Sequence, residues 1–185
     1  QRQMCIRDRC GPLFADGPEN ETTDWLEKAQ TSLKQGDAKC LDHAAKALEA
    51  EPLGADENLA MALSMFWAGH FDDAARYMRR ALAADANACM DHPLLSESMP
   101  AVTASERLNE LAPETESDAE LCFLAGTLLL IKEDRPRALA FLVRSAELAG
   151  TDGQAEALID DETGNRNERR GLIALSDGDY LDAVR

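Results

Sequence analysis

The histidines and cysteines are the residues best suited to nucleophilic, acid–base or metal chemistry, and their spacing supports none of these. Of the three histidines, His43 falls on a predicted helix surface, His70 in a predicted turn and His92 beside a proline. None has a Ser, Cys or acidic partner at a catalytic spacing. The sequence also contains no nucleophile elbow, phosphate-binding loop or dinucleotide-binding glycine motif. We therefore predict structural histidines and a protein that is not an enzyme.

The five cysteines show neither disulfide nor metal-binding spacing, because no Cys-x-x-Cys pair and no Cys/His cluster occurs. Cys40 and Cys122 fall on predicted apolar helix faces, where a thiol packs as a small hydrophobic group. Cys5 and Cys10 lie outside the predicted fold, and Cys89 lies in an irregular stretch. The sequence therefore predicts reduced, structural thiols, and we expect no metal and no cofactor.

An acidic run at residues 160–162 raises the question of a calcium site. The nearest glycine, Gly164, does not fall at the EF-hand spacing from any aspartate that has the required partners. We interpret residues 150–164 as a solvated acidic spacer, in which Ala155–Ile159 adds one turn of helix.

Acidic residues outnumber basic ones by 35 to 19, which gives a formal net charge of −16. Such a chain repels nucleic-acid phosphates and anionic membranes. The predicted partner is therefore a protein or peptide, with a basic one favoured, although a charge that serves only solubility is the alternative. No apolar run approaches the ~20 residues that span a bilayer, so we predict no membrane insertion. A cytoplasmic location is favoured.

Residues 56–86 show the pattern on which the expected fold depends. Apolar side chains recur there at steps of three and four, which is helical spacing. Asp56 occupies a predicted N-cap position, and Gly69 is expected to end the first helix in a left-handed conformation. A second helix is predicted to start near Asp72 and Asp73, whose charges suit a helix N-terminus. A turn this short requires the two helices to pack antiparallel.

This unit resembles a tetratricopeptide repeat, whose period is about 34 residues. The resemblance is carried by residues at the family's positions: Met61-Ala62, Met65, the turn Gly69-His70-Phe71, Ala74, Met78 and Ala81-Leu82, with Asn58 in place of the family's Trp and Ala86 in place of its Pro. The resemblance implies an all-α fold, a right-handed α-solenoid of antiparallel helix pairs that forms a tetratricopeptide-like superhelix.

The match extends over most of the chain as about four copies of uneven quality. The expected copies are 23–53, 56–86, a degenerate 87–116, 117–149 and a truncated 166–185. In the degenerate copy, prolines prevent a full first helix, so a loop is expected in its place, and Ala101–Leu111 is expected to form the second helix. The loop is interpreted either as a site for specific contacts or as a repeat that has lost its pattern. Residues 1–22 are expected to be a disordered lead, of which 1–9 is interpreted as a sequence artefact. We expect a fragment of a longer array, since the last helix is cut short.

In this family the first helix of each repeat lines a concave groove that holds partner segments. The resemblance therefore implies partner-binding roles for eight residues: Leu59, Leu63, Phe66, Trp67, Phe123, Thr127, Leu130 and Ile131. The alternative is that these side chains pack between neighbouring repeats. The implied function is a non-catalytic protein–protein interaction scaffold. The alternative functions are a regulatory or accessory segment of a larger enzyme, and an exported assembly factor; the flanking reading frame distinguishes them.

Overall fold

A computed structural model describes residues 18–86, 107–111, 115, 117–132 and 134–163, and these ranges are helical with no β-strand. The labelled helices are α1 (Pro18–Gln35), α2 (Cys40–Ala50), α3 (Ala55–Ala68), α4 (Phe71–Ala84), α7 (Ala119–Ile131), α8 (Arg135–Ala149) and α9 (Gly153–Thr163). The all-α expectation is thus confirmed. Within the described ranges, no helix has both the length and the apolar character needed to cross a membrane. The expectations for residues 1–17, for the loop of the degenerate copy and for copy 166–185 lie outside the described residues, as do those for Cys5, Cys10, Cys89 and His92.

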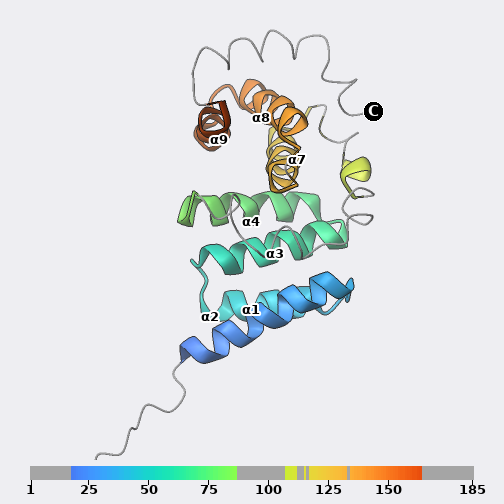
Figure 1. Cartoon of the computed structure of the whole chain (residues 1–185), viewed down its shortest axis with the longest axis vertical. Coiled ribbons are helices and arrows are strands. Elements are labelled where there is room, and N and C mark those ends of the chain that lie inside the picture. Colours follow the sequence, from blue (N-terminus) through green and yellow to red (C-terminus); the bar gives the residue numbers. More distant parts are fainter. Residues whose placement is uncertain (1–17, 87–106, 112–114, 116, 133, 164–185) are drawn as a thin grey trace, which may run out of the picture.

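The helices pack as consecutive pairs along the long axis of the molecule (Figure 1). The most extensive contacts are α1 with α2, α3 with α4, and α7 with α8. Between pairs, α3 packs against α1 and α2, and α4 packs directly against α7. The second and fourth predicted copies are therefore direct neighbours, although residues 85–118 separate them in the sequence.

Two glycine turns connect the helices where the sequence predicts them. Gly69 ends α3 with a φ of 83°, and its N–H donates to the carbonyl of Phe66 at 3.1 Å. Gly36 has a φ of 66° in the turn between α1 and α2. A positive φ is open to glycine and strained for residues with a Cβ. The predicted left-handed end of the first helix at Gly69 is therefore confirmed, and Gly36 has the same backbone conformation.

Replacing Gly69 with Ala should lower the free energy of unfolding by about 1 kcal/mol, because the Cβ strains a left-handed backbone. An added Cβ would meet only Arg107 Nη1, at 3.7 Å, so the loss would report backbone strain rather than a clash. Urea denaturation measures the change. Gly153→Ala is the matched control, since Gly153 has no positive φ and nothing within 4 Å of the added Cβ. Equal stability of the two variants would contradict the strain.

The N-terminal ends of α7 and α3 show where the N-cap residue can and cannot be recognised from the sequence. Asp118, one of the two cap candidates at the start of the fourth predicted copy together with Ser117, caps α7 and accepts hydrogen bonds from the N–H groups of Glu120 at 2.8 Å and Leu121 at 3.2 Å. The predicted cap of α3 is wrong: Gly54 is the N-cap and Asp56 lies in the first turn. The helix starts there because the Gly54 carbonyl accepts hydrogen bonds from both the backbone N–H and the side-chain amide of Asn58.

Two segments that were expected to be irregular are helical. Residues 18–22 of the predicted disordered lead form the first turns of α1. Most of the predicted acidic spacer is α9, an 11-residue helix. Its acidic residues 160–162 oppose the helix dipole, but burial of Ala155, Leu158 and Ile159 holds the helix against the rest of the core.

One hydrophobic cluster extends from Leu33 on α1 and Cys40 on α2 to α9, and close helix contacts are made at small residues. A Cβ added to Gly126 on α7 would lie 2.7 Å from Leu142 Cγ and 3.1 Å from the Ala138 carbonyl oxygen on α8. Gly126 therefore allows α7 and α8 to approach closely.

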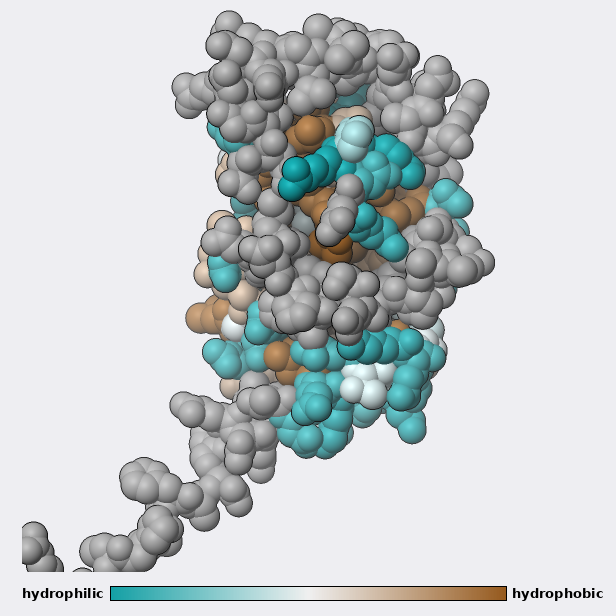
Figure 2. All heavy atoms as spheres, viewed as in Figure 1, coloured by the Kyte–Doolittle hydropathy of each residue, from teal (hydrophilic) through white to brown (hydrophobic). Residues whose placement is uncertain are grey.

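On the face shown in Figure 2, the end that carries α1 and α2 is mainly hydrophilic, whereas hydrophobic residues show between the hydrophilic ones farther along the axis.

Candidate functional site

Six of the eight predicted groove side chains lie in the interior of the protein. These are Leu59, Leu63, Phe66, Phe123, Thr127 and Leu130, each at most 8% exposed. They belong to α3 and α7, both of which are buried on nearly all sides. Apart from Thr127, all belong to one core cluster that spans α3, α4 and α7. The structure thus places these six residues as the packing alternative describes, and a partner cannot reach them without displacing a neighbouring helix.

The remaining two predicted groove residues, Trp67 and Ile131, are half-buried and pack against the edge of the same core cluster. They lie near the C-terminal ends of α3 and α7. The backbone carbonyl of Trp67 accepts a hydrogen bond from Arg107 Nε at 3.0 Å. Their partner-binding role stays a prediction, and they are the members of the set that a partner can reach.

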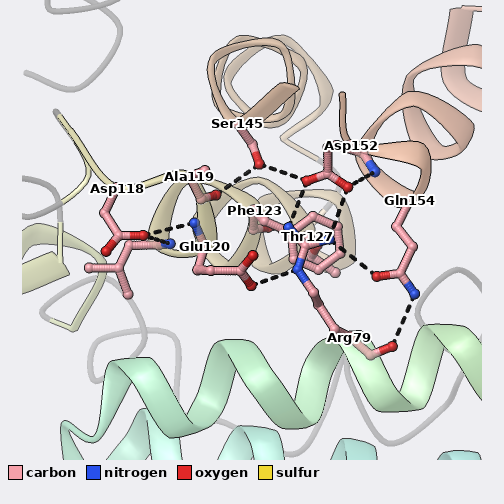
Figure 3. A network of polar contacts seen from close by, with 11 residues as sticks. Arg79, Asp118, Ala119, Glu120, Phe123, Thr127, Ser145, Asp152 and Gln154 are labelled. Carbon is pink, nitrogen blue, oxygen red and sulfur yellow. Dashed lines mark hydrogen bonds and ion pairs between the residues drawn. The ribbon is translucent and has the colours of Figure 1, made fainter. Parts of the chain in front are cut away.

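A buried ion pair between α4 and the start of α9 is the strongest polar feature of the described structure (Figure 3). Arg79 Nη2 lies 2.6 Å from Asp152 Oδ2, and Arg79 Nη1 donates to Asp152 Oδ1 at 3.0 Å. Arg79 Nε also donates to Glu120 on α7 at 2.6 Å. The guanidinium carbon lies 3.8 Å from the centre of the Phe123 ring. One guanidinium on α4 therefore contacts two segments, α7 and the start of α9, that are far from it in sequence.

The carboxylate of Asp152 is 6% exposed, yet it stays charged because polar groups surround it. Burial alone would raise the pKa of Asp152, but hydrogen bonds from Arg79, from the backbone N–H of Ala155 and from Ser145, together with the charge of Arg79, lower it below 3.8. Ser145 Oγ lies 3.1 Å from Asp152 Oδ2 and 2.8 Å from the carbonyl of Ala119, so it joins α8 to the same network. The network is a joint that holds α4, α7, α8 and α9 together.

An open cleft of about 580 Å³ lies beside this joint. The side chains that line it come from α4, from the start of α7 and from α9: Asp72, Arg76, Arg79, Arg80, Ala83, Glu120 and Gln154. Gln154 is tied to α4 twice, because its amide accepts from Arg79 Nη1 at 3.2 Å and donates to the Arg79 carbonyl at 3.1 Å. The sequence does not indicate this cleft, because its lining residues come from separate helices; Arg79 and Glu120, for example, are 41 residues apart.

His43 has a serine partner on the neighbouring helix, which the spacing of the two residues in the sequence does not indicate. Ser32 Oγ on α1 lies 3.0 Å from His43 Nδ1 on α2, and the Trp25 ring lies 5.8 Å from the imidazole. Both residues line a second hollow of about 430 Å³. Ser32 is only 6% exposed, and no carboxylate among the described residues hydrogen-bonds to His43. The pair therefore joins α1 to α2 and lacks the third group that orients a catalytic histidine.

The described thiols are Cys40 and Cys122, and both are buried, in agreement with their prediction on apolar helix faces. Burial raises the pKa of the Cys40 thiol. Cys122 Sγ donates to the carbonyl of Thr115 at 3.0 Å. Among the described residues, no group of His, Cys, Asp and Glu side chains could hold a metal ion.

Glu57 in the first turn of α3 is a buried carboxylate with no cationic partner among the described residues; it is 6% exposed. Burial raises its pKa above 4.5, and the nearby carboxylates of Glu51 and Asp56 add to the shift. Because the pKa of Glu57 is higher in the folded protein than in the unfolded chain, protonation of Glu57 at low pH stabilises the folded protein. Its contribution is lost as the pH rises from the unfolded pKa of about 4.3 through the folded value.

The neutral isostere Glu57→Gln should therefore stabilise the protein at pH 7, by up to about 1 kcal/mol. The difference from the unmodified protein should shrink towards pH 4, where Glu57 itself becomes neutral. Urea denaturation at both pH values measures it. Asp72→Asn, an exposed first-turn carboxylate on α4, is the control. A variant that is less stable than the parent at pH 7 would contradict the assignment.

No protein-family model, curated protein or solved structure matches this chain.

Proposed function

We propose that this protein is a non-catalytic scaffold for protein–protein interaction, built as a right-handed α-solenoid of tetratricopeptide-like repeats. The observation that carries the proposal is the packing order of the helices. Each helix pair packs mainly within itself and against the adjacent pair. Repeat proteins are built in this way, because each repeat buries its apolar face against its neighbours.

The turns and small residues support the same proposal. Gly36 and Gly69 make corresponding turns in the first two pairs, and Asp134 precedes α8 at the matching place in the next pair. Gly126 occupies a small-residue slot and permits the close approach of α7 and α8. These features recur at the positions where the resembled repeat needs them.

The accessible members of the predicted groove indicate where a partner would bind. Trp67 and Ile131 are half-buried, and each lies at the C-terminal end of the first helix of its pair. A large side chain that is partly exposed at a packed edge can anchor a partner, and tryptophan is enriched among residues that dominate binding energy.

Site-specific photo-crosslinking tests the scaffold proposal. A benzoylphenylalanine at position 67 should give a discrete adduct with one partner protein in cells. The control carries the same group in place of Leu53, which is 86% exposed and lies at the α2–α3 turn. If position 67 gives no adduct beyond those formed at position 53, this edge does not bind a partner and the proposal is wrong. Circular dichroism confirms that both proteins are folded.

A further inference from the structure

Residues 107–111 form a helical turn that lies against the C-terminal end of α3 (Figure 1, yellow). We call them the strap. Arg107 and Leu108 are half-buried and Leu111 is fully buried, whereas Asn109 and Glu110 are exposed. The inner side of the strap therefore consists of an arginine followed by leucines one and four residues later.

Arg107 joins the strap to the last turn of α3. That turn contains no basic residue of its own. Two of its carbonyls accept hydrogen bonds from backbone N–H groups of the turn that follows, and the Trp67 carbonyl accepts one from Arg107 Nε at 3.0 Å. The C-terminal end of a helix carries a partial negative charge, which a guanidinium stabilises. A segment 40 residues away thus supplies the cation that α3 lacks.

The strap lies at the edge where the sequence predicts that a partner binds. Trp67 is one of the two predicted groove residues that a partner can reach. A Cβ added to Gly69, just after α3, would lie 3.7 Å from Arg107 Nη1. Leu108 and Trp67 pack against the same core cluster, and Leu111 belongs to that cluster. The strap therefore occupies part of the edge that a partner needs.

Few contacts hold the strap in comparison with the helix that it covers. Leu111 is its one buried side chain, whereas nine of the 14 residues of α3 are buried. The ion pair between Arg107 and Glu110 is internal to the strap and partly exposed, so it contributes little to holding the strap in place. Segments with few buried apolar contacts open at a low cost in free energy. The strap can thus leave α3 while the helix pairs stay folded.

We propose that the strap is an autoinhibitory contact, which covers the Trp67 edge in the free protein and is displaced when a partner segment binds there. The proposal rests on the scaffold function and states how that site is regulated. The partner segment has the chemistry of the strap, because it takes the same place: a helical turn with an arginine for the Trp67 carbonyl and leucines for the core cluster. The alternative is that the strap is a fixed part of the core, and the following two experiments distinguish them.

Acrylamide quenching of tryptophan fluorescence tests the cover without a partner. Trp25→Phe leaves Trp67 as the only tryptophan of the chain. In that background, Arg107→Ala should raise the quenching constant of Trp67 about twofold or more, because the strap opens more often. Arg144→Ala is the matched control, since Arg144 also pairs with a glutamate three residues later but lies on α8. An unchanged quenching constant in Arg107→Ala would overturn the proposal, and so would loss of its helical circular dichroism signal.

Photo-crosslinking from benzoylphenylalanine at position 67 tests the competition with a partner. Arg107→Ala should increase the yield of the partner adduct about threefold or more, because the uncovered edge is more populated. Arg144→Ala should leave the yield unchanged. An equal or lower yield in Arg107→Ala would overturn autoinhibition and leave the scaffold function standing. The absence of an adduct in both Arg107→Ala and the parent would contradict the scaffold function itself, and this proposal with it.

Discussion

Asp152→Ala should cost about 3 kcal/mol or more of the free energy of unfolding, because removing one partner of a buried ion pair leaves the other charge uncompensated. Arg79 is 21% exposed and would keep only the exposed carboxylate of Glu120 as an anionic neighbour. The start of α9 would also lose the side chain that accepts from the Ala155 N–H at 3.2 Å. Urea denaturation followed by circular dichroism measures the loss.

Two controls separate the ion pair from other effects of the Asp152 substitution. Asp73→Ala breaks the exposed pair with Arg76 and should change stability by less than about 1 kcal/mol. The double variant Arg79→Met/Asp152→Leu removes both charges, and should be more stable than Asp152→Ala because no charge is left buried without a partner. If the double variant were the least stable of the three, the network would stabilise the fold by its packing rather than by its charges.

The contribution of Asp152 to the free energy of unfolding should decrease at low pH. Its folded pKa is lowered, so its stabilising effect is present above the unfolded pKa of about 3.9. It is lost as the pH falls through the lower, folded value. The difference in stability between the parent and Asp152→Ala should therefore be constant near neutral pH and shrink only below about pH 4.

Phe123→Ala should lower the free energy of unfolding by about 3–5 kcal/mol, the usual cost of removing a buried aromatic side chain. Phe123 is fully buried, and its ring supports the Arg79 guanidinium. The result decides between the two sequence-based interpretations of this residue, because a groove residue would affect partner binding and leave stability nearly unchanged.

Leu53→Ala provides the reference for the Phe123 substitution. Leu53 is 86% exposed, so its truncation should change stability by less than about 0.5 kcal/mol. If both variants unfolded at the same urea concentration, Phe123 would not be a core residue. Thermal melting in parallel would detect any loss of cooperativity.

A helix end can be predicted from the sequence where a single residue determines the local backbone conformation or caps the helix. Gly69 needs a positive φ, and Asp118 needs only the N–H groups of the next turn, so both could be recognised without the rest of the fold. Asp56 was assigned wrongly because Gly54, two residues earlier, also serves as an N-cap, and hydrogen bonds from Asn58 favour that start.

The joint at Arg79 could not be predicted, because nothing in the local pattern connects residues 73 positions apart. In the sequence, Arg79 lies in the C-terminal half of a predicted helix, where its positive charge suits the helix dipole. Asp152 lies in the predicted acidic spacer, and neither position indicates a contact with the other. Periodicity predicts which side of a helix is apolar, but it does not show which neighbour covers it. Phe123 on α7 is buried where α7 packs against α4, and this packing becomes visible only in three dimensions.

The direct packing of α4 against α7 has a consequence for how this chain tolerates changes in length. Because α4 and α7 pack directly against each other, their contact does not depend on the length of the chain that joins them. Each doubling of a loop costs only about 0.6 kcal/mol in closure entropy. Insertions between α4 and Arg107, which bonds to the Trp67 carbonyl, should therefore leave the stacked helices intact, so a reporter domain could be placed there.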